Sequence, residues 1–174
     1  MLTNRCPDGG RQLDGHRRET LMPMRRTVRK AVCYVVREDH LLVFTHNGVP
    51  MEVTGVQVPA GTVRPGEDPA DAAVRELHEE TGLRGTVVRY LGESAYDLWP
   101  MRPEIAARHF FQLDVPPGNI GTRWEAGEPD PDSGGAAASW TCWWLPLQQG
   151  HVLAGGLGAL LGRLEPDGIV HPKG

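Results

Sequence analysis

Residues 61–83 read GTVRPGEDPADAAVRELHEETGL, a turn-rich loop followed by a short acidic segment. Asp68 is a favourable helix N-cap, Pro69 suits the first helical position, and Gly82 is a natural stop. The sequence therefore predicts a helix between Asp68 and Gly82. One face should pack on a core, because small or apolar side chains recur there at helical spacing: Ala70, Ala73, Val74, Leu77 and Thr81.

Three carboxylates lie along the edge of that buried face. At 100° per residue, Glu76, Glu79 and Glu80 share an arc of about 100°. Glu80 borders the apolar stripe and should be partly buried, and Arg75 is four residues before Glu79, where the two can form an ion pair. Left unpaired, such carboxylates would cost several kcal/mol. Either some are protonated, or a hard divalent cation binds them, or the face is a solvated acidic surface.

The loop before the helix can contribute to a cation site. Gly61 allows its backbone carbonyl to approach closely, because glycine has no side chain. Glu67, at the end of the loop, can supply or support a further oxygen. Oxygen donors are the ligands that Mg²⁺ prefers, together with water and substrate phosphates.

The flanking sequence indicates one domain of the α/β (α+β) class, with a mixed sheet covered by helices. Residues 28–38 and 41–46 predict a β-hairpin, and a further short strand is expected within 52–61. Further strands are expected at 86–94, 107–115 and 140–147, and a helix at 151–164. Residues 116–139 are too polar and broken for a packed element. We expect the domain to span residues 27–165, between a loosely ordered basic tail at 1–26 and a C-terminal tail at 166–174.

Composition limits the partners and the compartment. The net charge of −4 over 174 residues argues against a protein that coats nucleic acid. Residues 1–30 carry eight Arg or Lys against three Asp or Glu, which we interpret as a solvated tail. An alternative is a tail that docks on RNA or an acidic partner. The three cysteines form no CxxC pair, and no apolar run is long enough to span a membrane or to form a signal peptide. We therefore expect a cytoplasmic protein that does not interact with membranes.

Residues 61–83 resemble the Nudix box, G-x5-E-x7-R-E-U-x-E-E-x-G-U, where U is a bulky aliphatic residue. Every fixed position of that motif is filled, by Gly61, Glu67, Arg75, Glu76, Leu77, Glu79, Glu80, Gly82 and Leu83. The resemblance implies the Nudix fold, a mixed β-sheet sandwiched between helices, over roughly residues 26–165.

The resemblance also implies an activity: a hydrolase acting on phosphorus-containing anhydrides, which cleaves a nucleoside di- or triphosphate or a nucleoside diphosphate conjugate with Mg²⁺ or Mn²⁺. It assigns Glu76, Glu79, Glu80 and the Gly61 carbonyl to the metal, while Arg75 holds Glu79. The family does not fix its general base, so a glutamate of the box remains a candidate beside Glu125 and Glu128 in the polar segment.

The substrate is expected to be a nucleotide-type small molecule, and no complete substrate signature of the family is present. Trp99 lies in an expected loop, where an indole could stack on a nucleobase. The arginines best placed to reach phosphate oxygens are Arg64, Arg102 and Arg108. The alternative function is a catalytically silent Nudix-like module that binds a nucleotide and regulates another process. Members of the family often form homodimers, so a homodimer is a possible state that the resemblance implies. No residue pattern in this chain indicates it independently.

Overall fold

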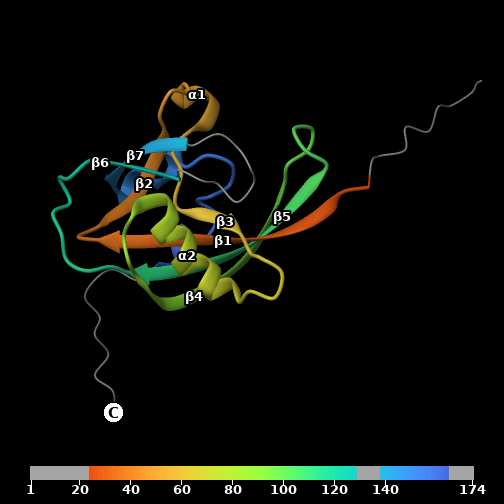
Figure 1. Ribbon diagram of the computed structural model, residues 1–174, viewed down its shortest axis with the longest axis horizontal. Coiled ribbons are helices and arrows are strands. Elements are labelled where there is room, and N and C mark those ends of the chain that lie inside the picture. The colour runs from red at the N-terminus through yellow and green to blue at the C-terminus, as the bar shows by residue number, and fades with distance from the viewer. Residues whose placement is uncertain (1–23, 129–137, 165–174) are drawn as a thin grey trace, which may run out of the picture.

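The computed structural model describes residues 24–128 and 138–164 of the chain. Its strands form one seven-stranded mixed sheet (Figure 1). In chain order the elements are β1 (Arg26–Arg37), β2 (His40–His46), α1 (Met51–Thr54), β3 (Ala60–Thr62), α2 (Pro69–Thr81), β4 (Thr86–Asp97), β5 (Glu104–Asp114), β6 (Trp124–Glu128), β7 (Ala138–Pro146) and the 3-10 helices η1 (Leu147–Val152) and η2 (Leu161–Arg163).

The sheet has the order β4-β5-β1-β2-β7-β6, and β3 pairs with β1 outside that path. Strands β1 and β5 are parallel, whereas the other pairs are antiparallel. The predicted hairpin of β1 and β2 is confirmed, and its turn places Glu38 and Asp39 at φ of 46° and 57°. The two strands pair only beside this turn and then diverge, which leaves the edge of β1 open to β3. Gly61 thereby lies opposite Ala31 of β1.

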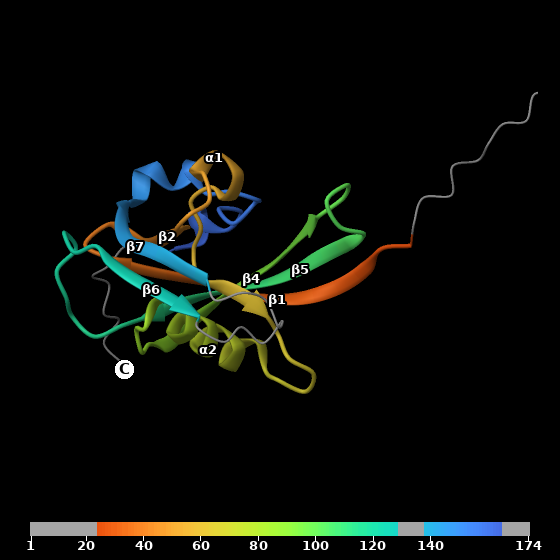
Figure 2. The ribbon, with the colours of Figure 1, turned by 45° about the horizontal axis from the view of Figure 1, so that its top comes forward.

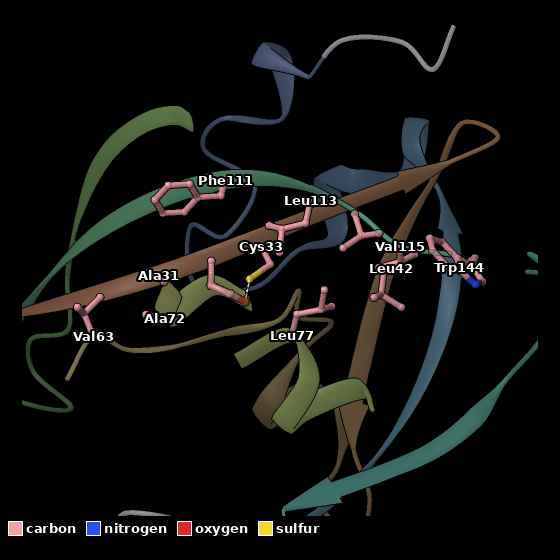
Figure 3. Packing of buried hydrophobic residues seen from close by; sticks show 12 residues of the cluster. Ala31, Cys33, Leu42, Val63, Ala72, Leu77, Phe111, Leu113, Val115 and Trp144 are labelled. Atoms are coloured by element: carbon pink, nitrogen blue, oxygen red, sulfur yellow. Dashed lines mark hydrogen bonds between the residues drawn. The ribbon is translucent and has the colours of Figure 1, made fainter. Parts of the chain in front are cut away.

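Alternation along β1 assigns its side chains to the two faces of the sheet. Ala31, Cys33 and Val35 belong to the cluster that packs against α2, in which Leu77 is fully buried (Figure 3). Val32 and Tyr34 belong to the cluster on the opposite face. Helix α1 and the turns after β7 cover that second face (Figure 2). The predicted mixed sheet between helices is therefore confirmed, with α2 on one face and α1 and the turns after β7 on the other.

The helix predicted at 151–164 is wrong. This segment forms turns that end in the 3-10 helix η2. Gly155 and Gly156 adopt positive φ, 58° and 72°, which side chains disfavour and an α-helix cannot contain. The apolar spacing nevertheless indicated burial correctly, because the leucines of this segment pack on the second face of the sheet: Leu153, Leu157, Leu160, Leu161 and Leu164.

Two further expectations need correction. The polar segment 116–139 does contain a packed element, since β6 pairs with β7 along its whole length. An edge strand needs only one apolar face, and here Trp124 and Ala126 provide it. Residues 129–137 lie outside the described residues. Within 52–61 the strand is confined to β3, because Met51–Thr54 form the helical turn α1.

Residues 1–23 and 165–174 lie outside the described residues, so both predicted tails stay predictions. Cys33 and Cys142 are buried, unpaired core residues, as expected. Within 24–128 and 138–164, no helix is both long enough and apolar enough to cross a membrane.

Tyr34 connects the C-terminal turns to the sheet, and its removal should change the alkaline stability. Its buried hydroxyl donates to the Leu157 carbonyl at 2.5 Å, and burial raises the pKa of Tyr34 to about 12. The stability that comes from this raised pKa is present below the unfolded value of about 10 and is lost as the pH rises through 10 to 12. We expect Tyr34→Phe to cost about 1–2 kcal/mol at neutral pH, from the lost hydrogen bond. Urea unfolding from pH 8 to pH 12 should show a shallower alkaline decline than in the wild type, and parallel curves would contradict this.

Candidate active site

Helix α2 begins and ends as its sequence predicts. The Asp68 carboxylate accepts a hydrogen bond from the Ala70 amide at 2.8 Å, and Gly82 ends the helix in the left-handed conformation. Two indoles hold the last turn from outside the helix. Trp124 donates from Nε1 to the Thr81 carbonyl at 2.8 Å, and Trp140 donates to the Glu80 carbonyl. These bonds satisfy carbonyls that a helix end leaves open and fix the acidic last turn against β6 and β7.

Arg75 is the centre of the acidic cluster. It binds Glu67 through two parallel hydrogen bonds, Nε to Oε1 at 2.8 Å and Nη2 to Oε2 at 3.0 Å. Its Nη1 donates to Glu76 at 2.7 Å and to Glu79 at 2.8 Å. The expected pair with Glu79 is thus present, and two further carboxylates share the guanidinium. The hydrogen bonds from Arg75 lower the pKa of Glu67 to about 2.

The Glu76 carboxylate lies directly against Gly61. A Cβ built on Gly61 would be 1.8 Å from the Glu76 Cδ, so only glycine fits there. Glu76 is the buried member of the carboxylates, with 9% of its surface exposed, and burial raises its pKa while Arg75 opposes that rise. Glu80, expected to be partly buried, is so, and accepts from the Ala60 amide at 2.8 Å. Two carboxylates therefore meet the backbone of one short strand, β3.

The donor types of this cluster fit a hard divalent cation. Glu76, Glu79, Glu80 and the Gly61 carbonyl offer oxygen donors, the ligand type such a cation prefers. Arg75 pairs with Glu67, Glu76 and Glu79, and Arg64 also pairs with Glu79. The side chains as placed do not yet form a ligand shell, since among the described residues no three acidic, histidine or cysteine side chains converge on one point. Hydrogen bonds to Arg75 and to Ala60 hold them instead.

Basic side chains and carboxylates line one hollow of about 550 Å³. Arg64 and Arg102 line it with Glu76 and Glu79, and the Arg64 Nη2 lies 3.4 Å from the Glu79 Oε1. Lys30 lines it too, and was missed; its Nζ donates to the Thr62 hydroxyl at 2.7 Å, and burial lowers its pKa. A positively charged residue within a strand of otherwise buried apolar residues is a sequence signal that could have indicated a role in the site.

A second hollow, of about 210 Å³, adjoins the first, because Lys30 and Arg102 line both. It lies over the second face of the sheet, where apolar Leu98, Ala106 and Leu157 form much of its wall. The second hollow therefore continues the cationic lining of the first, through Lys30, Arg102 and Arg108, and adds apolar side chains to it.

The other predicted substrate residues lie in different places. Arg108 lines the second hollow, where its guanidinium lies 4.6 Å from the Tyr96 ring and donates to the Gly155 carbonyl. Trp99 is 43% exposed beside Arg25 and, among the described residues, is not part of either wall. Glu125 is exposed on β6 and lines, together with Glu79, a further hollow at the C-terminal end of α2. The structure does not bring Glu125 into the Arg75 network, and the side chain of Glu128 lies outside the description.

Replacing Arg75 with lysine should destabilise the fold. Lysine cannot reproduce the two parallel bonds to Glu67 while also reaching Glu76 and Glu79. We expect the free energy of unfolding to fall by about 1–3 kcal/mol, measured by urea unfolding at neutral pH. Arg84→Lys, at an exposed position, is the matched control. Equal stability of the two variants would show that the network contributes little.

The chain is similar to known proteins in part of its sequence and in its fold. The RNA pyrophosphohydrolase of Brucella ovis is 37% identical over 100 residues, which are 52% of this chain and 54% of that protein. The chain thus spans about half the length of the curated relatives it matches. A NUDIX hydrolase from Nitrosomonas europaea has a TM-score of 0.56 at 18% identity, covering 85% of this chain and 98% of that one.

A UDP-X diphosphatase also has a TM-score of 0.56, at 12% identity, covering 83% of this chain and 64% of that one. At these identities the two structures establish the fold. The sequence of residues 26–158 matches the family model described as the NUDIX domain, which is well over half of the chain. The match includes the whole Arg75 network and every strand of the described sheet, and the chain therefore belongs to the NUDIX family.

Proposed function

We propose that this protein hydrolyses a phosphoanhydride bond in a nucleotide-type substrate and depends on Mg²⁺ or Mn²⁺. The observation that carries the proposal is a single hollow lined by both carboxylates, Glu76 and Glu79, and basic side chains, Lys30, Arg64 and Arg102. Bound phosphates need basic groups and a divalent cation together. The RNA pyrophosphohydrolase relative supports the same reaction class.

Each group of residues has a distinct task in this mechanism. The Gly61 carbonyl, Glu76, Glu79 and Glu80 would hold the cation, which neutralises phosphate charge and lowers the pKa of a water. Lys30, Arg64 and Arg102 bind the phosphate oxygens and orient the anhydride. Water attacks phosphorus, the bridging P–O bond breaks, and the water's proton passes to a carboxylate of the cluster. Arg75 fixes the positions of Glu76 and Glu79.

A phosphate-release screen tests the proposal. Nucleoside di- and triphosphates, nucleotide sugars, dinucleotides and 5′-triphosphorylated oligonucleotides are each incubated with Mg²⁺, with Mn²⁺, and with a chelator. We expect at least one compound to be hydrolysed with Mg²⁺ or Mn²⁺. This hydrolysis should be lost in the presence of the chelator. If no compound in the panel is cleaved under any metal condition, the result favours the alternative function, a catalytically silent nucleotide-binding module.

We also propose a cytoplasmic location, supported by the two unpaired, buried thiols of Cys33 and Cys142. Fractionation of the source cells with an antibody against the chain checks this, and recovery in an oxidising compartment would contradict it.

A further inference from the structure

One face of β7 directs two hydrogen-bond donors at a single carbonyl of α2. Trp140 donates from Nε1 to the Glu80 carbonyl, and the Cys142 thiol donates to the same oxygen at 3.8 Å. The two residues are two positions apart on β7, so alternation places both side chains on one face of the strand. The last carbonyls of a helix have no partner within the helix. At Glu80 that partner comes from a distant strand of the sheet.

The Trp140 indole is held firmly by the residues around it. Only 3% of Trp140 is exposed, and its ring centroid lies 5.6 Å from those of both Phe44 and His46 on β2. Phe44, Trp140 and Cys142 form a buried cluster of their own. A closely packed ring has few alternative positions, so its N–H keeps a fixed direction. Strands β2 and β7 therefore determine where the backbone of Glu80 lies.

The carboxylate of Glu80 is held by a different strand. It accepts a hydrogen bond from the Ala60 amide of β3 at 2.8 Å. Glu80 thus connects two parts of the sheet, with its backbone bound to β7 and its side chain bound to β3. A shift of the backbone would move the carboxylate or lengthen the bond to Ala60. Ligands of a functional site must stay within about 0.5 Å of their working positions, so such a shift would weaken cation binding.

Trp124 makes the same kind of bond one residue further along the helix. Its Nε1 donates to the Thr81 carbonyl at 2.8 Å. The Thr81 side chain is buried, and its hydroxyl donates to the Leu77 carbonyl at 2.6 Å. Thr81 therefore offers no ligand to the acidic cluster. Two indoles hold two adjacent residues of one helix end, and only one of these residues carries a proposed metal ligand.

We propose that Trp140 is a positioning residue for the divalent cation, because it sets the location of the Glu80 carboxylate through the Glu80 backbone. This inference rests on the proposed function, which assigns Glu80 to the metal. Groups that orient a metal ligand from outside commonly change metal affinity or activity by about 10- to 100-fold when they are removed. Trp140 acts on the cation only through Glu80, which makes its effect separable from a general loosening of the helix end.

The test measures the dissociation constant for Mn²⁺ on the full chain without nucleotide, by electron paramagnetic resonance of the free ion. Trp140→Phe keeps an aromatic ring and removes the N–H, and should raise this constant about tenfold. Trp124→Phe removes the matched bond to Thr81 and should bind Mn²⁺ as the wild type does. Cys142→Ala is a further variant, in case Trp140→Phe does not fold. It should raise the constant about two- to threefold, because a thiol is a weak donor.

A double variant shows whether Trp140 acts through Glu80. In a Glu80→Gln background, adding Trp140→Phe should cause no further loss of Mn²⁺ affinity, because the residue that the indole positions no longer carries the anionic ligand. Thermal unfolding of every variant is recorded in parallel, so that a loss of affinity is compared only between folded proteins.

The outcomes are separable. If Trp140→Phe and Trp124→Phe weaken Mn²⁺ binding equally, the helix end is merely loosened and the positioning role is refuted. Wild-type affinity in both Trp140→Phe and Cys142→Ala refutes it too, as does an equal loss from Trp140→Phe with and without Glu80→Gln. In each of these cases the proposed hydrolysis stands. If the wild type itself binds no Mn²⁺, the cation-dependent function fails, and the positioning role fails with it.

Discussion

Replacing Glu80 with glutamine should lower turnover by about 100- to 1,000-fold while the protein stays folded. Glutamine keeps the size of the side chain and an oxygen that can accept the 2.8 Å hydrogen bond from the Ala60 amide. It loses the negative charge that would bind a divalent cation. The measurement is kcat on the best substrate of the screen, with thermal unfolding recorded in parallel.

The concentration of Mg²⁺ at half-maximal rate gives a second measurement, which a purely structural role of Glu80 would not change. We expect it to rise in the variant, because one anionic oxygen ligand is gone. Glu52→Gln, on the exposed surface of α1, is the control and should resemble the wild type in both measurements. Wild-type turnover and wild-type Mg²⁺ dependence in Glu80→Gln would contradict the assignment of Glu80 to the metal site.

Local chemistry explains why α2 was predictable. Its first turn depends on Asp68, its last on Gly82, and both act on neighbours within a few residues. The β1–β2 hairpin is similar, because its strands are adjacent in sequence. The helix expected at 151–164 failed for the opposite reason. There the apolar spacing correctly predicted which residues are buried. The four glycines of the segment make a helix unfavourable, and the leucines pack on the sheet from turns instead.

The acidic residues of the candidate site were predictable from their spacing, whereas Lys30 and the contacts between these residues were not. Spacing on a helix identifies the Arg75–Glu79 pair. It cannot show that the loop returns Glu67 to Arg75, or that Glu76, rather than Glu80, is the most closely enclosed carboxylate. Both depend on where β3 lies, and β3 is placed by the divergence of β1 from β2. Lys30 enters the site for the same reason, through its bond to Thr62 of β3.

Gly61→Ala should nearly abolish activity and also lower stability. The added Cβ would lie 1.8 Å from Cδ and 1.9 Å and 2.1 Å from the two oxygens of Glu76. Glu76 is buried and bound to Arg75, so its carboxylate can move only by breaking that 2.7 Å bond. We expect unfolding to become easier by about 1–3 kcal/mol, the usual cost of overpacking. Turnover should fall by about 100-fold or more, because a displaced Glu76 would no longer support the proposed cation.

A double variant separates the steric cause from a general weakness of β3. In Gly61→Ala/Glu76→Ala the overlapping carboxylate is absent, so stability should recover relative to Gly61→Ala alone, whereas activity should not. Gly162→Ala is the matched control, because its Cβ would have nothing within 4 Å and its φ lies outside the positive range that side chains avoid. Urea unfolding and kcat are measured for all four proteins, including the wild type. If the double variant is as unstable as Gly61→Ala, the contact with Glu76 is not the cause. That result would contradict the proposed steric clash between a side chain at residue 61 and the Glu76 carboxylate.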